Sequence, residues 1–154
     1  MTRTKKKVLS LCAGMILLAT AANLWAAPQT ASGNQTLYKR LGGFDALAAV
    51  TDDFIAGMAA DPQLKRFFSG FNERSLHRIR EHVVDFLCQA TGGPCMYHGQ
   101  DMKTAHTGLH ITEEDWQAGV KDLNATLDKF KFPDRERSEV LSAIRGLKSD
   151  IVGR

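Results

Sequence analysis

Residues 102–112 read Met102-Lys103-Thr104-Ala105-His106-Thr107-Gly108-Leu109-His110-Ile111-Thr112, and this stretch decides the fold. Met102 to His106 is expected to form one short helix, because the segment from Cys95 to His110 otherwise lacks apolar periodicity. Gly108 indicates that this helix has ended, so His110 is predicted to lie at the surface. Thr112, followed by three acidic residues, is typical of a helix start. The stretch therefore presents His106 at the end of a short helix, just before a long one.

The segments on both sides of this stretch show helical rather than alternating periodicity. Each of four expected helices has an apolar stripe. In residues 44–58 it is Leu47, Val50, Phe54, Ile55 and Met58, and in a helix that starts at residues 72–75 it is Leu76, Ile79, Val83, Phe86 and Leu87. In the helix that follows Thr112 it is Trp116, Val120, Leu123, Leu127 and Phe130, and in a last helix that begins at Pro133 it is Val140, Leu141, Ile144, Leu147 and Ile151. Asp61-Pro62 breaks the first helix before a short turn with Leu64, Phe67 and Phe68, and Gly92-Gly93-Pro94 ends the next helix. No strand is expected, so the predicted fold class is all-α.

The N-terminal residues 1–26 are predicted to be a signal peptide. Four basic residues at positions 3–7 precede an apolar run from Val8 to Ala22, which is shorter than the ~20 residues of a membrane span. Cleavage is expected after Ala26, and an uncleaved anchor is the alternative. Without residues 1–26, 16 basic and 17 acidic residues remain, a net charge of −1, which argues against a nucleic-acid binder. The mature protein is expected to be exported to the periplasm, with no stable membrane anchor.

The rest of the chain is predicted to form one domain. Residues 27–36 are polar and are expected to be a linker, and residues 37–152 are expected to be the folded domain. Cys88 and Cys95 flank the Gly-Gly-Pro turn and would meet an oxidising compartment after export. They form either a disulfide or two reduced thiols. The chain has no CxxC pair, which argues against zinc-finger and thioredoxin-like proteins.

Three motifs in order resemble a known family. Leu41-Gly42-Gly43, Gly92-Gly93-Pro94 and the 102–109 segment just before Ile111-Thr112 are similar to the motifs of a group I, cyanoglobin-like truncated haemoglobin. The resemblance covers roughly Leu37 to Ile151. It implies a two-over-two helical sandwich that holds haem b, with glycines allowing tight turns.

The resemblance also implies the residues that line the haem. His106 corresponds to the proximal histidine that binds the iron, and Phe68 to the phenylalanine that packs on the haem face. Tyr97 matches a Tyr-x-Gly pattern near the haem propionates, and Arg78, Arg80 and Lys103 are candidates to pair with those propionates or to face water. The remaining predicted lining is Phe54, Ile55, Ile79, Val83, Phe86, Met102, Leu109, Ile111 and Trp116, whose other interpretation is ordinary core.

His82 is similar in position to a distal histidine of cyanobacterial family members. That histidine can bind the iron opposite the proximal ligand; the alternative is a histidine at the pocket rim that touches a propionate or solvent. The distal side otherwise departs from the family, because Ile55 replaces its usual Tyr, and Ile79 and Val83 occupy its frequent Gln positions. Without these donors a bound O₂ is expected to lose about 1–3 kcal/mol.

The resemblance therefore predicts a haem b protein that binds a diatomic gas (O₂, NO or CO) or exchanges electrons with a redox partner. The alternative is a haem enzyme of the NO dioxygenase or peroxidase-like type. The missing distal donors argue against efficient O₂ storage and against NO dioxygenation. A helical interaction module without haem is the third hypothesis.

Overall fold

The computed structural model describes residues 35–154 of the 154-residue chain. The predicted signal peptide, residues 1–26, and residues 27–34 of the predicted linker lie outside the described residues. The two described linker residues lead into the first helix, which Thr36 caps by accepting a hydrogen bond from the Lys39 N–H.

The described chain is all-α, as the sequence predicts, and residues 35–154 contain no strand. The elements are α1 (Leu37–Arg40), α2 (Gly43–Ala60), the 3₁₀ helix η1 (Lys65–Phe68), α3 (Glu73–Ala90), α4 (Met102–His106), α5 (Glu113–Lys129), α6 (Asp134–Gly146) and α7 (Lys148–Ile151). Among these described helices, none is long and apolar enough to cross a membrane.

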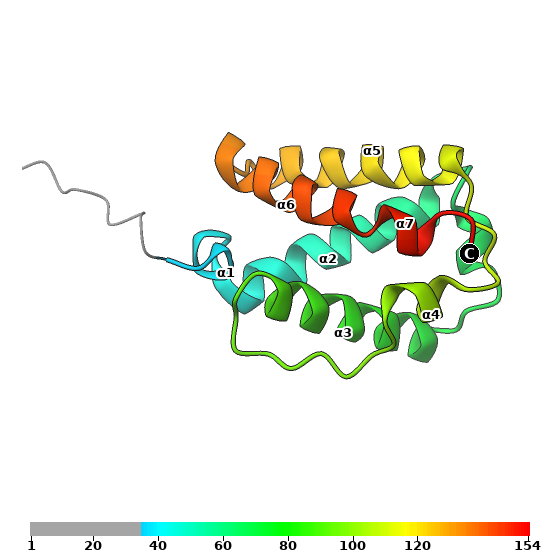
Figure 1. The fold of residues 1–154 in the computed structure, drawn as a ribbon, viewed down its shortest axis with the longest axis horizontal. Coiled ribbons are helices and arrows are strands. Elements are labelled where there is room, and N and C mark those ends of the chain that lie inside the picture. Colours follow the sequence, from blue (N-terminus) through cyan, green and yellow to red (C-terminus); the bar gives the residue numbers. More distant parts are fainter. Residues whose placement is uncertain (1–34) are drawn as a thin grey trace, which may run out of the picture. The chain divides into compact units, whose positions relative to one another are not determined.

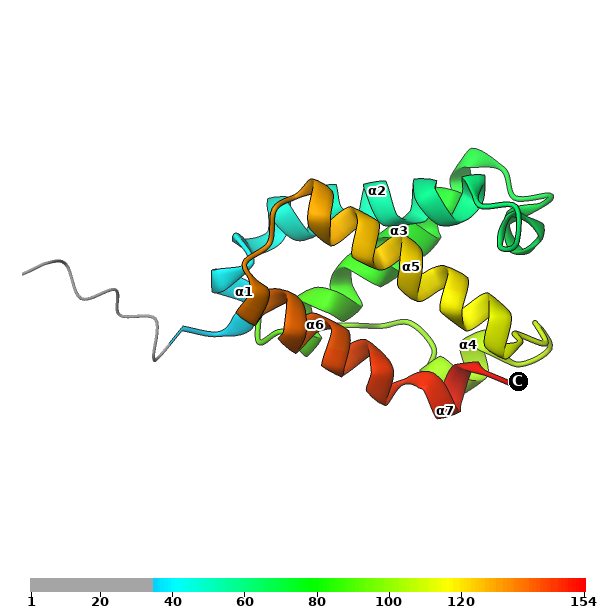
Figure 2. The same ribbon diagram turned by 90° about the horizontal axis from the view of Figure 1, so that it is seen from above.

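The helices form two layers (Figure 1). α2 packs against α3 in one layer, and α5, which packs on α2, lies with α6 in the other. Seen from above, α5 crosses over the α2–α3 layer, while α4 and α7 lie side by side at the end of the molecule that carries the C-terminus (Figure 2). α4 is therefore held between a long loop, residues 91–101, and the C-terminal helix α7.

The two long helices that follow loops begin where the sequence predicts. Asn72 accepts a hydrogen bond from the Ser75 N–H and caps α3. Thr112 caps α5 in a capping box, in which Asp115 accepts a hydrogen bond from the Thr112 N–H in return. Both caps satisfy N–H groups that a helix start leaves without partners.

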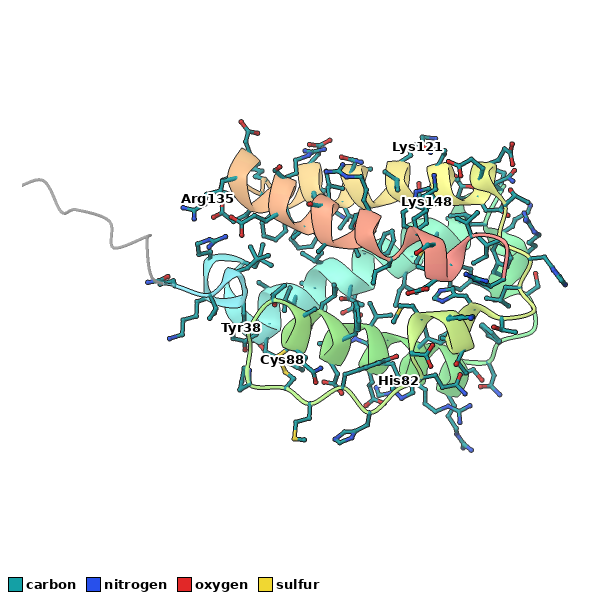
Figure 3. All side chains as sticks on the ribbon, viewed as in Figure 1. Tyr38, His82, Cys88, Lys121, Arg135 and Lys148 are labelled. Atoms are coloured by element: carbon teal, nitrogen blue, oxygen red, sulfur yellow. A yellow bond between two sulfur atoms is a disulfide. The ribbon has the colours of Figure 1, made fainter. Side chains whose placement is uncertain are left out.

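The tightest core lies where α1, α2 and the end of α3 meet. Leu41, Leu47 and Cys88 are buried there, and Tyr38 and Cys95 pack against them. Cys88 and Cys95 form a disulfide with Cα atoms 5.7 Å apart, so the disulfide alternative of the sequence analysis is the one observed (Figure 3). The bond ties the last turn of α3 to the start of the 91–101 loop.

The glycine pair after α3 makes this close approach sterically feasible. Gly92 has a φ of 81°, which few L-residues adopt. A Cβ on Gly93 would lie 2.7 Å from Cys88 Sγ and 2.6 Å from Tyr38 Cδ2, so a side chain would displace both.

The last helix differs from the prediction. It is not continuous from Pro133 to Ile151, because it stops at Gly146 and resumes at Lys148 after a single turn residue, Leu147. Glycine is a poor helix former, and Gly146 therefore explains why the helix is interrupted at this position. Pro133 is the residue before the helix rather than its first residue.

Candidate functional site

His106 ends α4 and is held in one ring orientation. Its Nδ1 lies 2.7 Å from the backbone oxygen of Met102, one helical turn earlier. A carbonyl can only accept a hydrogen bond, so Nδ1 carries the proton and donates it. In the neutral imidazole this leaves Nε2 with a free lone pair, which is the form that binds a metal ion.

The start of α4 is fixed by Asp101. Its carboxylate accepts hydrogen bonds from the Thr104 N–H at 2.9 Å and from the Thr104 hydroxyl at 2.7 Å. These bonds, the backbone one first, hold the pKa of Asp101 below its usual value. The carboxylate therefore stays charged and keeps the short helix capped at neutral pH.

The predicted apolar lining comes from five elements and is less buried than the core around Cys88. Ile55 on α2 and Trp116 on α5 are buried, each about 9% exposed. The others keep part of their surface accessible: Phe54, Phe68, Ile79, Val83, Phe86, Met102 and Ile111. Half-buried aromatic and branched side chains in the middle of a domain offer apolar surface to a flat, apolar group. Accessible apolar side chains and a histidine of this chemistry are the groups that would hold a haem.

Leu109 is more exposed than the other apolar residues of the predicted lining. It is 42% exposed, in the loop between α4 and α5. The turn at Gly108, with a φ of 85°, redirects the chain immediately after His106 and turns Leu109 outward. His110 is exposed as predicted.

Two hydrogen bonds and an aromatic contact hold Tyr97 in place within the 91–101 loop. Its N–H donates to the side-chain oxygen of Gln89 on α3, and its hydroxyl donates to the backbone oxygen of Gln100. Its ring meets the edge of Phe86, with ring centroids 5.4 Å apart. Burial, and then the charge of Asp101, raise the pKa of the hydroxyl, so it remains a neutral donor.

His82 is exposed on α3 (Figure 3). It lines two surface hollows, one of about 400 Å³ with Phe44 and His98, and one of about 290 Å³ with Phe71 and Ile79. The structure brings His82 together with two other predicted site residues: Ile79, which shares the smaller hollow, and Tyr97, whose ring centroid lies 6.2 Å from that of His82. Iron binding by His82 stays a prediction, and it requires the side chain to turn inward from this position.

The three basic residues that are candidates to pair with the haem propionates differ in their present contacts. Arg80 is already occupied, because its guanidinium donates to both carboxylate oxygens of Asp52, at 2.6 and 3.1 Å. Arg78 and Lys103 are exposed. Arg78 lines the smaller hollow beside Ile79 and His82, so it is the better placed of the two for a negatively charged group there.

Two features near the site are absent from the sequence analysis. Phe71 and Ser75 line the hollow that leads to Ile79. Asp115, expected only as an acid in the first turn of α5, is fully buried and accepts hydrogen bonds from Gln63 at 2.7 Å and Arg66 at 2.5 Å. Asp115 therefore fastens the start of α5 to η1, which carries Phe68. In the sequence, the indication of this contact is the high density of polar groups in residues 61–66.

Comparison with known proteins places the chain in a family. A model of the bacterial-like globin family matches residues 36–152. The group 1 truncated haemoglobin of Mycolicibacterium paratuberculosis is 35% identical over 116 residues, which are 75% of this chain and 83% of the relative. The group 1 truncated haemoglobin of Tetrahymena pyriformis is 32% identical over 120 residues, 78% of this chain and 97% of the relative.

Solved structures agree with the sequence relatives. The truncated haemoglobin of Tetrahymena pyriformis in its Fe(III) form matches with a TM-score of 0.72 and 30% identity, over 78% of this chain and 100% of that one. The 2/2 haemoglobin of a Synechococcus species, solved in the cyanomet state with covalently attached haem, matches with a TM-score of 0.71 and 25% identity, over 78% and 100% of the two chains. The predicted two-over-two helical sandwich is therefore confirmed.

Proposed function

The chain belongs to the bacterial-like globins as a group 1 truncated haemoglobin, and from this we propose that it is a haem b protein that binds O₂ or another diatomic gas. Its relatives and structural neighbours are named as haemoglobins, and one of them is described with haem attached. A haem bound through one histidine of this chain would supply an iron that can bind a gas molecule.

His106 is the residue that we propose as the proximal ligand. The observation that carries the proposal is the 2.7 Å hydrogen bond from its Nδ1 to the Met102 oxygen, which leaves Nε2 free. His106 is also only partly buried, so part of its surface is accessible to a partner. Met102 and Ile111 lie on either side of it in the chain and supply apolar surface against the porphyrin.

The opposite side of the proposed pocket is poor in hydrogen-bond donors. Ile55 is buried, Ile79 and Val83 are half-buried, and none of the three carries a polar side-chain atom. An apolar pocket does not stabilise the negative charge that develops when O₂ binds to ferrous haem. These residues support gas binding or electron exchange with a redox partner over long-term O₂ retention. They do not favour NO dioxygenase or peroxidase-like chemistry, which needs such donors.

Export to the periplasm is part of the proposal. The disulfide between Cys88 and Cys95 supports it, because disulfides persist in oxidising compartments. The basic and apolar residues 1–26 have the composition of a signal peptide. The mass of the protein isolated from the producing cells tests it: we expect a chain that begins at Ala27, and a full-length chain would contradict cleavage.

The visible spectrum tests the proposed function. Purified protein mixed with haem should show a Soret band, and the band of the ferrous form should shift when CO is added. His106→Ala should lose most of the haem, and added imidazole should restore it, because free imidazole can occupy the missing ligand position. His77→Ala is the matched control, since this histidine is exposed on α3 and is not among the predicted haem-lining residues. Full retention of the wild-type spectrum in His106→Ala would refute the ligand assignment.

A further inference from the structure

The helix that carries His106 is too short to be stable by itself. α4 has five residues, Met102–His106, and a helix of this length in water does not repay the cost of its first turn. Its C-terminal neighbour, Gly108, has a φ of 85°, and no atom lies within 4 Å of where its Cβ would be. The position of His106 must therefore be set by what α4 packs against, which is α7.

Two backbone hydrogen bonds fasten the chain just after His106 to the chain just after α7. The Gly153 N–H donates to the Ile111 oxygen at 2.8 Å, and the His110 N–H donates to the Arg154 oxygen at 2.6 Å. The bonds run in opposite directions between the two segments, so together they resist both sliding and separation. Both segments contain a residue with a positive φ, 51° at His110 and 76° at Gly153, so this pairing needs specific backbone conformations.

Side chains fix the same region to the rest of the fold. The Arg154 guanidinium donates to the Ser149 oxygen on α7, at 3.2 Å from Nε and 2.8 Å from the other nitrogen. Lys148, labelled in Figure 3, donates to Glu113 at the start of α5 at 2.8 Å. The second contact is exposed and contributes little by itself. The first holds the Arg154 backbone in place for its bond with His110.

We propose that α7 and Val152–Arg154, which we call the C-terminal clamp, position His106 for the iron. The inference rests on the proposed function, because it concerns the ligand named there. Only Thr107, Gly108 and Leu109 separate His106 from the clamped residues His110 and Ile111. A loosened clamp lets α4 move away from the α3 side of the domain, and the imidazole then binds the iron at a poorer distance and angle. Gly153 is a positioning residue and does not touch the haem.

Gly153→Pro tests the clamp. Proline has no N–H to donate to Ile111, and its φ near −65° excludes the observed 76°. Losing one backbone hydrogen bond should speed the transfer of haem to an acceptor protein by about 2- to 12-fold. Gly153→Ala keeps the N–H but disfavours the positive φ, so its effect should be smaller. Gly119→Ala is the matched control, because this α5 glycine has open space around it and no positive φ.

A second background separates positioning from general loosening of the fold. In His106→Gly, with imidazole as the replacement ligand, the iron ligand no longer depends on α4. Gly153→Pro should then leave the rate of haem transfer unchanged, whereas a general loss of stability would still accelerate it. The inference would be overturned if Gly153→Pro accelerated haem transfer equally in the His106→Gly and wild-type backgrounds, or if it caused no acceleration in the haem-loaded wild-type background. Either result would leave the proposed function standing. If Gly153→Pro does not fold, the same comparison with Gly153→Ala decides. No Soret band in the unmutated protein would overturn the proposed function as well.

Discussion

The rings of His82 and Tyr97 meet edge to face, with centroids 6.2 Å apart and planes at 87°. Tyr97 is held in turn by its bonds to Gln89 and Gln100, and the disulfide anchors the start of its loop. His82 therefore lies against a fixed partner at the edge of the proposed pocket. Turning inward to the iron breaks this aromatic contact, which is worth about 0.5–1.5 kcal/mol.

We predict that His82 nevertheless occupies the sixth coordination position when no external ligand is present. Ile55, Ile79 and Val83, the residues predicted on that side, carry no side-chain atom that could bind the iron in its place. The ferrous protein should then be low-spin and six-coordinate, and His82→Leu should make it five-coordinate. Gas affinity in the unmutated protein is reduced by the fraction of chains in which His82 is bound. A five-coordinate ferrous spectrum in the unmutated protein would rule out the sixth-ligand role and favour the alternative of a histidine at the pocket rim.

A hydrogen-bond donor introduced at Ile55 should slow the loss of O₂. Ile55→Tyr places a hydroxyl on α2 where the family commonly has one. A gain of about 1–3 kcal/mol corresponds to an O₂ dissociation rate roughly 5- to 150-fold lower. Ile55→Phe is the control for ring size, since it lacks the hydroxyl. Stopped-flow measurements decide: equal O₂ dissociation rates in the two variants would show that the hydroxyl does not reach the ligand.

Reduction of the disulfide should lower the free energy of unfolding by about 2–3 kcal/mol, because the loop it closes is short. Urea unfolding with and without a thiol reductant measures the difference. Cys95→Ala should be as unstable as the reduced protein and insensitive to the reductant. Cys88→Ala is a poorer control, since Cys88 is fully buried and its removal leaves a cavity. Alkylation of the protein without reductant should modify neither cysteine; two modified cysteines would show that the bond is absent.

Asp115 should make stability depend on pH in the acid range. Burial raises the pKa of its carboxyl, but the hydrogen bonds from Thr112, Arg66 and Gln63 together outweigh burial and hold the pKa below the usual value. A carboxyl with a lowered pKa stabilises the fold above its unfolded-state pKa of about 3.9, and this stabilisation is lost as the pH falls through the folded-state value.

The variant Asp115→Asn checks the pH effect. At pH 7 it should cost about 1–3 kcal/mol of unfolding free energy, since Arg66 loses its buried partner. The difference in unfolding free energy from the unmutated chain should begin to narrow below about pH 4, where Asp115 is protonated in the unfolded chain, and should narrow further as the pH falls through the lower folded-state pKa. Urea unfolding of the haem-free chain avoids any contribution from acid release of haem. A gap of equal size at pH 7 and pH 3 would contradict the assignment.

Much of this fold is encoded locally, and for that reason the sequence predicts it. The Asn72 and Thr112 caps involve residues three positions apart, and the turn at residues 92–94 follows from glycine and proline. The motif around His106 points to the ligand for the same reason. The bonds that connect distant segments are not predictable in this way. The Gly153–Ile111 bond joins two backbones and has no side-chain signature, and Arg66 pairs with Asp115 across 49 positions.

The C-terminal clamp also affects the order in which a new chain matures. Gly153 and Arg154 leave the ribosome after every helix of the domain, and the segment from His106 to Arg154 takes roughly 2–10 s to synthesise at about 5–20 residues per second. During that interval α2, α3 and the 102–106 segment are already made, but nothing yet fastens residues 110 and 111. The nascent chain can thus display His106, the proposed iron ligand, without a fixed place for it. Stable capture of haem is therefore expected only after translation of the domain is complete.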